Sequence, residues 1–158
     1  WACGKLKVPA PNLFAKLEAN SKWFASHSQP QHLSNAAWAC ARLNVPSPRL
    51  FADIQTQAER LVEGHQSTQA LVNILWACGT LGHEAPQVFD QMDRRAKWLV
   101  EHGTVQGISN TLWACASVNH PAPRLVQEID KNASWMVQKG DTQNTSNMAL
   151  AFGELVGV

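Results

Sequence analysis

Residues 73–82 read Asn73-Ile74-Leu75-Trp76-Ala77-Cys78-Gly79-Thr80-Leu81-Gly82, and the centre of this stretch returns along the chain at a nearly fixed interval. The tripeptide Trp-Ala-Cys recurs with spacings of 37, 38 and 37 residues, starting at Trp1, Trp38, Trp76 and Trp113. An altered fifth copy, Leu150-Ala151-Phe152, follows 37 residues later. Self-similarity at such a period is typical of repeat proteins, whose units bury their apolar faces against neighbouring units.

The register extends beyond the tripeptide. Gln and Asn precede each of the last four copies by seven and three residues, and a proline follows each of the first four copies, at Pro11, Pro48, Pro86 and Pro123. Residues 69–81 are almost wholly apolar or small, which predicts an inner helix packed on several sides. After Pro86, the residues Phe89, Met92, Ala96, Leu99 and Val100 follow helical spacing and predict a second, amphipathic helix. The extra residue of the 38-residue repeat is expected in a loop near residues 64–68.

The sequence therefore predicts an all-α fold: an α-solenoid of 37–38-residue two-helix repeats, with about four repeats plus half-units at the ends. We expect residues 1–158 to form a single array that is part of a longer solenoid, with repeats starting near Trp1, Trp38, Trp76, Trp113 and Leu150. Lys139-Gly140 and His102-Gly103 resemble helix C-termini. Both ends stop within a repeat, so we expect further repeats or a partner to cover their apolar faces.

The composition excludes several function classes. Charged residues make up 16% of the 158 residues, against about 25% in typical domains, and the net charge is +1. These values exclude a highly charged nucleic-acid-binding tail and a polybasic membrane anchor. Residues 64–83 and 104–123 lack charge but contain Gln and Asn, so no direct membrane insertion is expected. The sequence carries no recognisable targeting signal.

One stripe of the inner helix combines an amide, an aromatic ring and a cation or hydroxyl group. Gln69, Asn73 and Trp76 share it with Thr80, whose register holds Lys5, Arg42 and Ser117 in other repeats. These groups suit single-stranded RNA, about one base per repeat. The candidate RNA-binding residues are Gln31, Asn35, Arg42, Gln69, Asn73, Gln106, Asn110, Gln143 and Asn147. Alternatively, the amides cap or bridge neighbouring helices and the Trp rings wedge between them.

The second helix carries a different set of large residues on the side opposite its core face. Trp98 lies there, and the same register holds Trp23, Arg60 and Trp135. Outward Trp residues indicate either contact with a protein partner or a ring that covers a neighbouring helix.

The sequence offers little support for catalysis or for a metal or other cofactor. Cys3, Cys40, Cys78 and Cys115 share one register, so we expect about 8–10 Å between successive backbones, beyond the limit of about 7 Å for a disulfide. We expect small core residues in a reducing compartment. The histidines are expected to cap helices or face solvent. Asp90 and Asp93 lie beside three basic residues and are expected in a solvated charged surface, and no catalytic motif occurs.

The period and the Asn-x-x-Trp-Ala core resemble the octotricopeptide repeat family, and are similar to the helical arrays of RAP-domain and FAST-kinase-like proteins. Residues 73–82 and 110–116 carry the resemblance most clearly. It implies an RNA-binding α-solenoid of chloroplasts or mitochondria that acts in transcript stabilisation, processing or translation. The alternative hypothesis is a non-catalytic scaffold subunit that docks proteins in a large organellar assembly, such as a ribosome or a membrane complex.

Overall fold

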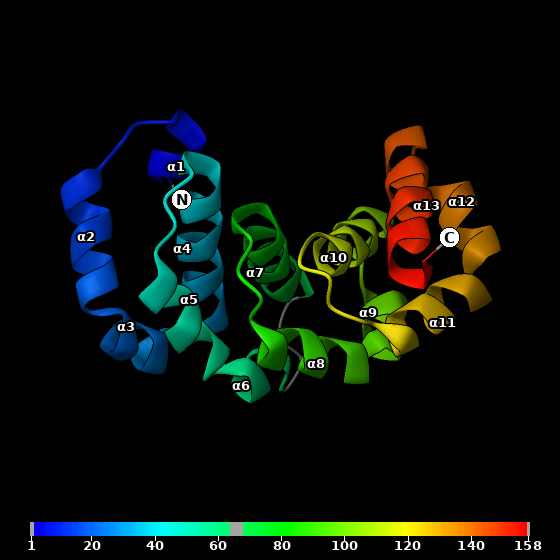
Figure 1. Ribbon diagram of the computed structural model, residues 1–158, viewed down its shortest axis with the longest axis horizontal. Helices are drawn as coiled ribbons and strands as arrows, with labels where there is room; N and C mark the ends of the chain where they lie inside the picture. Colours follow the sequence, from blue (N-terminus) through cyan, green and yellow to red (C-terminus); the bar gives the residue numbers. More distant parts are fainter. Residues whose placement is uncertain (1, 64–67, 158) are drawn as a thin grey trace.

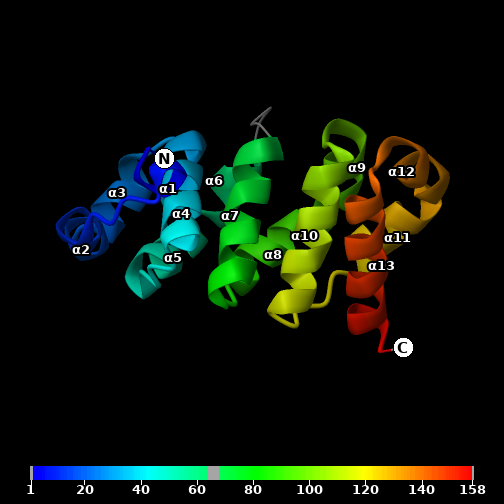
Figure 2. The same cartoon turned by 90° about the horizontal axis from the view of Figure 1, so that it is seen from above.

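The computed structural model describes residues 2–63 and 68–157, and these residues form thirteen helices with no strand among them. The expected repeat start at Trp1 and most of the loop expected near residues 64–68 lie outside the described residues. Four long helices carry the repeated stretch or its altered copy, and a shorter one precedes them: α1 (Ala2–Leu6), α4 (Pro30–Leu43), α7 (Thr68–Leu81), α10 (Val105–Ser117) and α13 (Thr142–Val156). These inner helices pack in chain order, each against the next, as Figure 2 shows.

Shorter outer helices connect the inner ones and lie along one side of them (Figure 1). They come in pairs: α2 (Pro11–Ala19) with α3 (Ser21–His27), α5 (Pro48–Gln55) with α6 (Ala58–Val62), α8 (Pro86–Arg94) with α9 (Ala96–His102), and α11 (Pro123–Lys131) with α12 (Ala133–Lys139). Each pair contacts the next pair along the chain, because α3 packs on α5, α6 on α8 and α9 on α11. The all-helical class predicted from the sequence is confirmed.

The prediction of one continuous second helix per repeat is wrong. The helix breaks at equivalent positions in all four pairs, at Asn20, residues 56–57, Arg95 and Asn132. Asn20, Arg95 and Asn132 have φ between -106° and -112° and ψ between 15° and 19°, outside the helical region. The Asn20 and Asn132 side chains donate to the carbonyls of Lys16 and Glu128, four residues earlier. An Asn side chain can take the place of a backbone N–H group as the donor to such a carbonyl. The chain therefore bends here although no proline or glycine is present at the break.

Most helix termini agree with the sequence signals. Outer pairs begin at Pro11, Pro48, Pro86 and Pro123, because proline has no N–H to lose at the first helical position. Helices α9 and α12 end before Gly103 and Gly140, as expected, but neither glycine is left-handed. A Cβ atom at Gly103 would lie 2.5 Å from the Leu99 carbonyl oxygen, so the absence of a side chain is what the turn requires.

The core runs continuously between the inner and outer helices. Its largest fully buried side chains include Leu71, Ile74 and Leu75 of α7 and Phe89 and Met92 of α8. Inner helices approach closely at Gly79, where an added Cβ atom would lie 2.9 Å from the Ala114 Cα atom of α10. This approach leaves no room for a larger residue at position 79.

Side chains of the first three outer pairs cap the first outer helix of the next pair. The Glu18 carboxylate accepts from the backbone N–H groups of Arg49 and Leu50, at 2.7 and 3.0 Å. In the same register, Gln55 Oε1 accepts from Gln87 N–H at 3.3 Å and Asp93 Oδ1 from Leu125 N–H at 2.9 Å. Asp93 is therefore buried, and the prediction that it belongs to a solvated charged surface is wrong because it satisfies a helix N-terminus.

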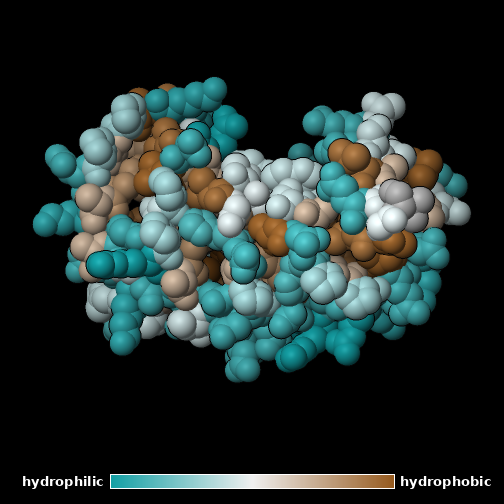
Figure 3. Space-filling view, in the orientation of Figure 1, coloured by the Kyte–Doolittle hydropathy of each residue, from teal (hydrophilic) through white to brown (hydrophobic). Residues whose placement is uncertain are grey.

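Large apolar side chains are exposed near the two ends of the array. The described residues of this kind are Leu6, Val8, Leu13 and Trp23 on one side, and Trp135, Val137, Leu150 and Val156 on the other. Figure 3 shows apolar patches at both ends of the molecule. Within the described ranges, no helix combines the length and the apolar character needed to cross a membrane.

Candidate nucleic-acid interface

The repeated glutamines form an exposed row across the four long inner helices. Gln31, Gln69, Gln106 and Gln143 lie in the first turns of α4, α7, α10 and α13, and all four are exposed. The asparagines one turn later are half-buried: Asn35, Asn73, Asn110 and Asn147. Because the inner helices pack side by side in chain order, the structure brings these amides together as two parallel rows. We call them the amide rows.

Some of these amides also hold the helices together. Gln31 Nε2 donates to Asn35 Oδ1 at 3.1 Å, and Gln69 Nε2 donates to Asn73 Oδ1 at 2.8 Å, each within one helix. Asn73 Nδ2 reaches across to the Ser34 hydroxyl of α4 at 3.3 Å. The bridging role left open by the sequence is therefore present at Asn73, whereas the glutamines remain the more accessible members of the rows.

The Trp residues of the repeat wedge between inner helices. A Cβ atom added at Gly79 would lie 3.1 Å from Cζ3 of Trp113, and one added at Gly4 would lie 3.0 Å from Cζ3 of Trp38. Trp38, Trp76 and Trp113 are all half-buried, and Trp76 and Trp113 pack against the core. These contacts favour the packing role for the rings of Trp38 and Trp113.

Cations and hydroxyl groups follow the Trp residues in the same stripe. Arg42 is exposed, and its guanidinium carbon lies 5.8 Å from the centre of the Trp38 ring. The hydroxyls of Thr80 and Ser117 donate to carbonyls of their own helices, those of Trp76 and Trp113. Arg42, together with Lys5 of α1, therefore supplies the positive charge of this stripe.

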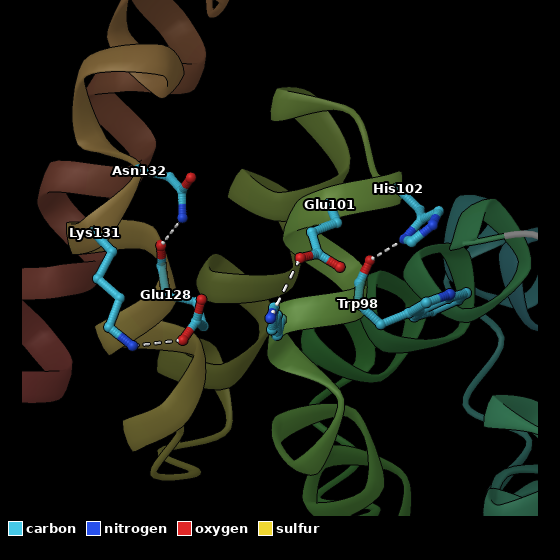
Figure 4. Close-up of polar contacts among 7 residues, drawn as sticks. Trp98, Glu101, His102, Glu128, Lys131 and Asn132 are labelled. Atoms are coloured by element: carbon cyan, nitrogen blue, oxygen red, sulfur yellow. Dashed lines mark hydrogen bonds and ion pairs between the residues drawn. The ribbon is translucent and has the colours of Figure 1, made fainter.

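The outward row predicted on the second helix is only partly exposed. Trp23 has 64% of its surface exposed and Trp135 has 38%, but Trp98 is half-buried and packs against the core. Figure 4 shows Trp98 beside His102, whose Nδ1 lies 3.0 Å from the Trp98 carbonyl oxygen; the two rings stack at 5.9 Å. Lys97 and Glu101, and Lys131 and Glu128, form ion pairs on the surface of these outer helices.

Arg60, the fourth member of that row, binds the neighbouring repeat of the same chain. Its guanidinium donates to the carbonyls of Ala25 and Ser28 at the end of α3, at 2.5 and 2.8 Å. A cation at a helix C-terminus is stabilising. The structure therefore separates this row into two exposed end positions, Trp23 and Trp135, and two positions used for packing.

Sequence reasoning missed a structural role for two histidines. His83 stacks on Phe51 with ring centroids 4.3 Å apart, and His120 lies against Phe89 at 5.2 Å. Both were expected to cap helices or face solvent. The available signal was their shared register, 37 residues apart in the turn after an inner helix and before a proline.

The cysteines are core residues, as predicted. Cys40, Cys78 and Cys115 are buried, Cys3 is half-buried, and all four are free thiols. Burial raises the pKa of the Cys78 and Cys115 thiols to about 12, because a low-polarity environment disfavours the thiolate. Such thiols are poor nucleophiles. Within residues 2–63 and 68–157, no three His, Cys, Asp or Glu side chains gather as a metal site would require.

Comparisons with protein-family models, with curated proteins and with solved structures find no match to this chain.

Proposed function

We propose that the chain is an α-solenoid module that binds single-stranded RNA along α4, α7, α10 and α13. The observation that carries the proposal is the exposed glutamine in the same position on four successive inner helices, with a half-buried asparagine one turn below each. Each amide offers both a donor and an acceptor. These groups match the edges of unstacked bases, which is how sequence-specific proteins recognise single-stranded RNA.

The small positive charge of the inner-helix stripe supports a modest affinity for RNA that depends only weakly on salt concentration. Lys5 and Arg42 carry its positive charge, and the chain as a whole has a net charge of +1. Neutralising two phosphates gives a slope of log K against log salt of about -1.4, from about -0.7 per phosphate for single strands. Most of the binding free energy would then come from contacts with bases. The resemblance to octotricopeptide repeats favours an organellar transcript as the ligand.

The test compares two variants: one replaces the exposed glutamines of the inner helices by alanine, and the other replaces exposed glutamines of the outer helices. The variant Gln31→Ala/Gln69→Ala/Gln106→Ala/Gln143→Ala removes the exposed row, and the control Gln87→Ala/Gln127→Ala/Gln138→Ala removes exposed glutamines of the outer helices. Affinity for labelled single-stranded RNA is measured by fluorescence anisotropy. Losing four hydrogen bonds of about 1 kcal/mol each weakens binding by at least 100-fold, while the control stays within about threefold. Equal affinities for the two variants would refute the proposal.

The exposure of Trp23 and Trp135 supports a second candidate, a scaffold subunit that docks proteins at its ends. Aromatic side chains dominate the binding energy of many protein interfaces. The candidate predicts that Trp23→Ala/Trp135→Ala abolishes co-sedimentation of the chain with organellar ribosomes, whereas replacement of the half-buried Trp98 by Phe leaves it intact. Co-sedimentation that is unchanged in the double variant would exclude these rings as the docking surface.

A further inference from the structure

One position of the inner helices changes in charge from one end of the array to the other. It lies four residues after the Trp of each repeat, on the stripe of the amide rows, and it holds Lys5, Arg42, Thr80, Ser117 and Glu154. All five side chains are exposed. Because the inner helices pack side by side in chain order (Figure 2), these side chains form a row across the array. The row runs from two cations through two hydroxyl groups to a carboxylate.

The last inner helix, α13, also differs from the others in its ring. Leu150 replaces the Trp of the repeat and is 61% exposed, whereas Gln143 and Asn147 keep their positions in the amide rows. An aromatic ring stacks on the base of a single strand, and a cation binds its phosphate. Helix α13 therefore offers the amides of the stripe together with a carboxylate, in place of a ring and a cation.

The charge of Glu154 does not stabilise its own helix. Lys5 and Arg42 lie in the last turns of α1 and α4, where a positive charge is favourable, but Glu154 lies in the last turn of α13, where a negative charge is unfavourable. Among the described residues, none forms a hydrogen bond or an ion pair with its carboxylate. Glu18 and Asp93, in contrast, use their carboxylates to cap helices of the next repeat. The Glu154 carboxylate is thus available to a ligand.

We propose that α13 binds the 3′ end of a single-stranded RNA, with the Glu154 carboxylate accepting hydrogen bonds from the 2′- and 3′-hydroxyl groups of the terminal ribose. The inference rests on the proposed function and deepens it, because it gives the bound strand a direction and an end. Carboxylates bind ribose hydroxyls in dinucleotide-binding folds in the same way. Hydrogen bonds to an ionised acceptor are also stronger than those between neutral groups.

The two ends of the row match the chemical difference between the body of an RNA strand and its 3′ end. Every nucleotide except the last is followed by a phosphate, which the guanidinium of Arg42 attracts and the carboxylate of Glu154 repels. Only the last ribose presents two adjacent hydroxyl groups without a phosphate. The 5′ part of the strand therefore lies toward α1 and α4, and its last nucleotide lies on α13.

Three strands that differ only at the 3′ end test the proposal. They are short mixed-sequence RNA oligonucleotides that carry fluorescein at the 5′ end and finish in an ordinary ribose, in a 3′-phosphate or in a 2′,3′-dideoxyribose. Fluorescence anisotropy gives the affinity of the whole chain for each strand. The strand with the ordinary ribose should bind about tenfold more tightly than either of the others, because only it donates to the carboxylate.

Three variants connect this preference to Glu154. Glu154→Gln removes the charge at the same size and should bring the affinities for the ordinary and the 3′-phosphate strands to within about twofold. Glu154→Lys should reverse the preference, because an ammonium group attracts the added phosphate. Glu59→Gln makes the same change as the first variant at an exposed residue of the outer helix α6, and it should keep the preference of the unchanged chain.

The outcomes separate this inference from the binding of RNA itself. The 3′-end site is overturned if the unchanged chain binds the ordinary and the 3′-phosphate strands equally, or if Glu154→Gln keeps the preference. Equal binding of all three strands that still depends on the glutamine row refutes the 3′-end site alone and supports the proposed function. Absence of binding to any strand, by a chain with intact helices, refutes both.

Discussion

The cap that Asp93 provides for the next outer helix leads to a sharp prediction for stability. Asp93 is 9% exposed, and its Oδ1 accepts from the Leu125 N–H at 2.9 Å, 32 residues away. Asp93→Ala removes this acceptor and leaves the first turn of α11 without its partner. Loss of a side-chain cap costs about 0.5–2 kcal/mol, and a buried donor left unpaired costs about 1–3 kcal/mol. We expect a loss of about 2 kcal/mol in the free energy of unfolding.

The chain contains a matched control for this change. Asp130 occupies the same register one repeat later but is exposed, and Asp130→Ala should cost less than about 0.5 kcal/mol. Urea titration followed by circular dichroism gives both values. A thermal scan should show a fall in Tm of about 4–8 °C for Asp93→Ala, from about 2–4 °C per kcal/mol at this chain length. If the two variants differ by less than about 0.5 kcal/mol, the cap does not couple the repeats.

Three other predictions concern packing and protonation. Gly79→Ala should destabilise the chain by about 1–2 kcal/mol in urea, because a Cβ atom 2.9 Å from Ala114 Cα forces α7 and α10 apart; a more stable variant would contradict this close approach. His83→Val should cost about 1 kcal/mol by removing the ring stacked on Phe51, and an unchanged urea midpoint would show that the stack contributes nothing. The pKa values of Cys78 and Cys115 are about 12 in the folded chain. Above about pH 9 both thiols therefore stay protonated in the folded chain while they ionise in the unfolded chain. The free energy of unfolding should then fall by about 1.4 kcal/mol per pH unit for each thiol. A pH titration of the urea midpoint checks this, and Cys78→Ala/Cys115→Ala should flatten the dependence; an equal slope in that variant would contradict it.

Periodicity predicts the helices better than it predicts their ends. The inner helix expected over residues 69–81 is found as Thr68–Leu81, because apolar residues at helical spacing specify which sides are buried. The break at Arg95 was not foreseen, since no proline or glycine marks it and the apolar stripe continues across it. At this break the Arg95 guanidinium donates to the Val62 carbonyl at the end of α6, in the preceding repeat, a contact that periodicity does not reveal.

The sequence was enough to predict which residues belong to the candidate site, but not which of them bind other parts of the chain. Register alone was enough to expect that Gln31, Gln69, Gln106 and Gln143 would fall on one side of successive helices. It did not distinguish these exposed amides from Asn73, which bridges two helices, because that depends on the Ser34 hydroxyl of the neighbouring repeat. It likewise did not show that Arg60 is used within the chain while Trp23 is exposed. Equivalent residues occupy the same position in every repeat. Their hydrogen-bond partners, however, belong to neighbouring repeats, whose sequences differ.

The histidine turns show the same limit. Val45, His83 and His120 share a backbone hydrogen bond to the carbonyl of a cysteine, which the spacing of the repeat is sufficient to predict. Whether the side chain stacks on the preceding phenylalanine depends on whether it carries a ring, as His83 and His120 do. Both histidines were expected to cap helices or face solvent, so this stacking was not foreseen.

The most direct test of RNA binding along the inner helices is the affinity of the folded chain for single-stranded RNA, titrated from about 50 to about 200 mM salt. With contacts from Lys5 and Arg42 and a slope of about -1.4, affinity should fall only about sevenfold over this range. The Gln31→Ala/Gln69→Ala/Gln106→Ala/Gln143→Ala variant should bind weakly at every salt concentration. No binding at about 50 mM salt, by a chain whose circular dichroism shows intact helices, would contradict the account and leave the exposed rings of Trp23 and Trp135 as the surface to pursue.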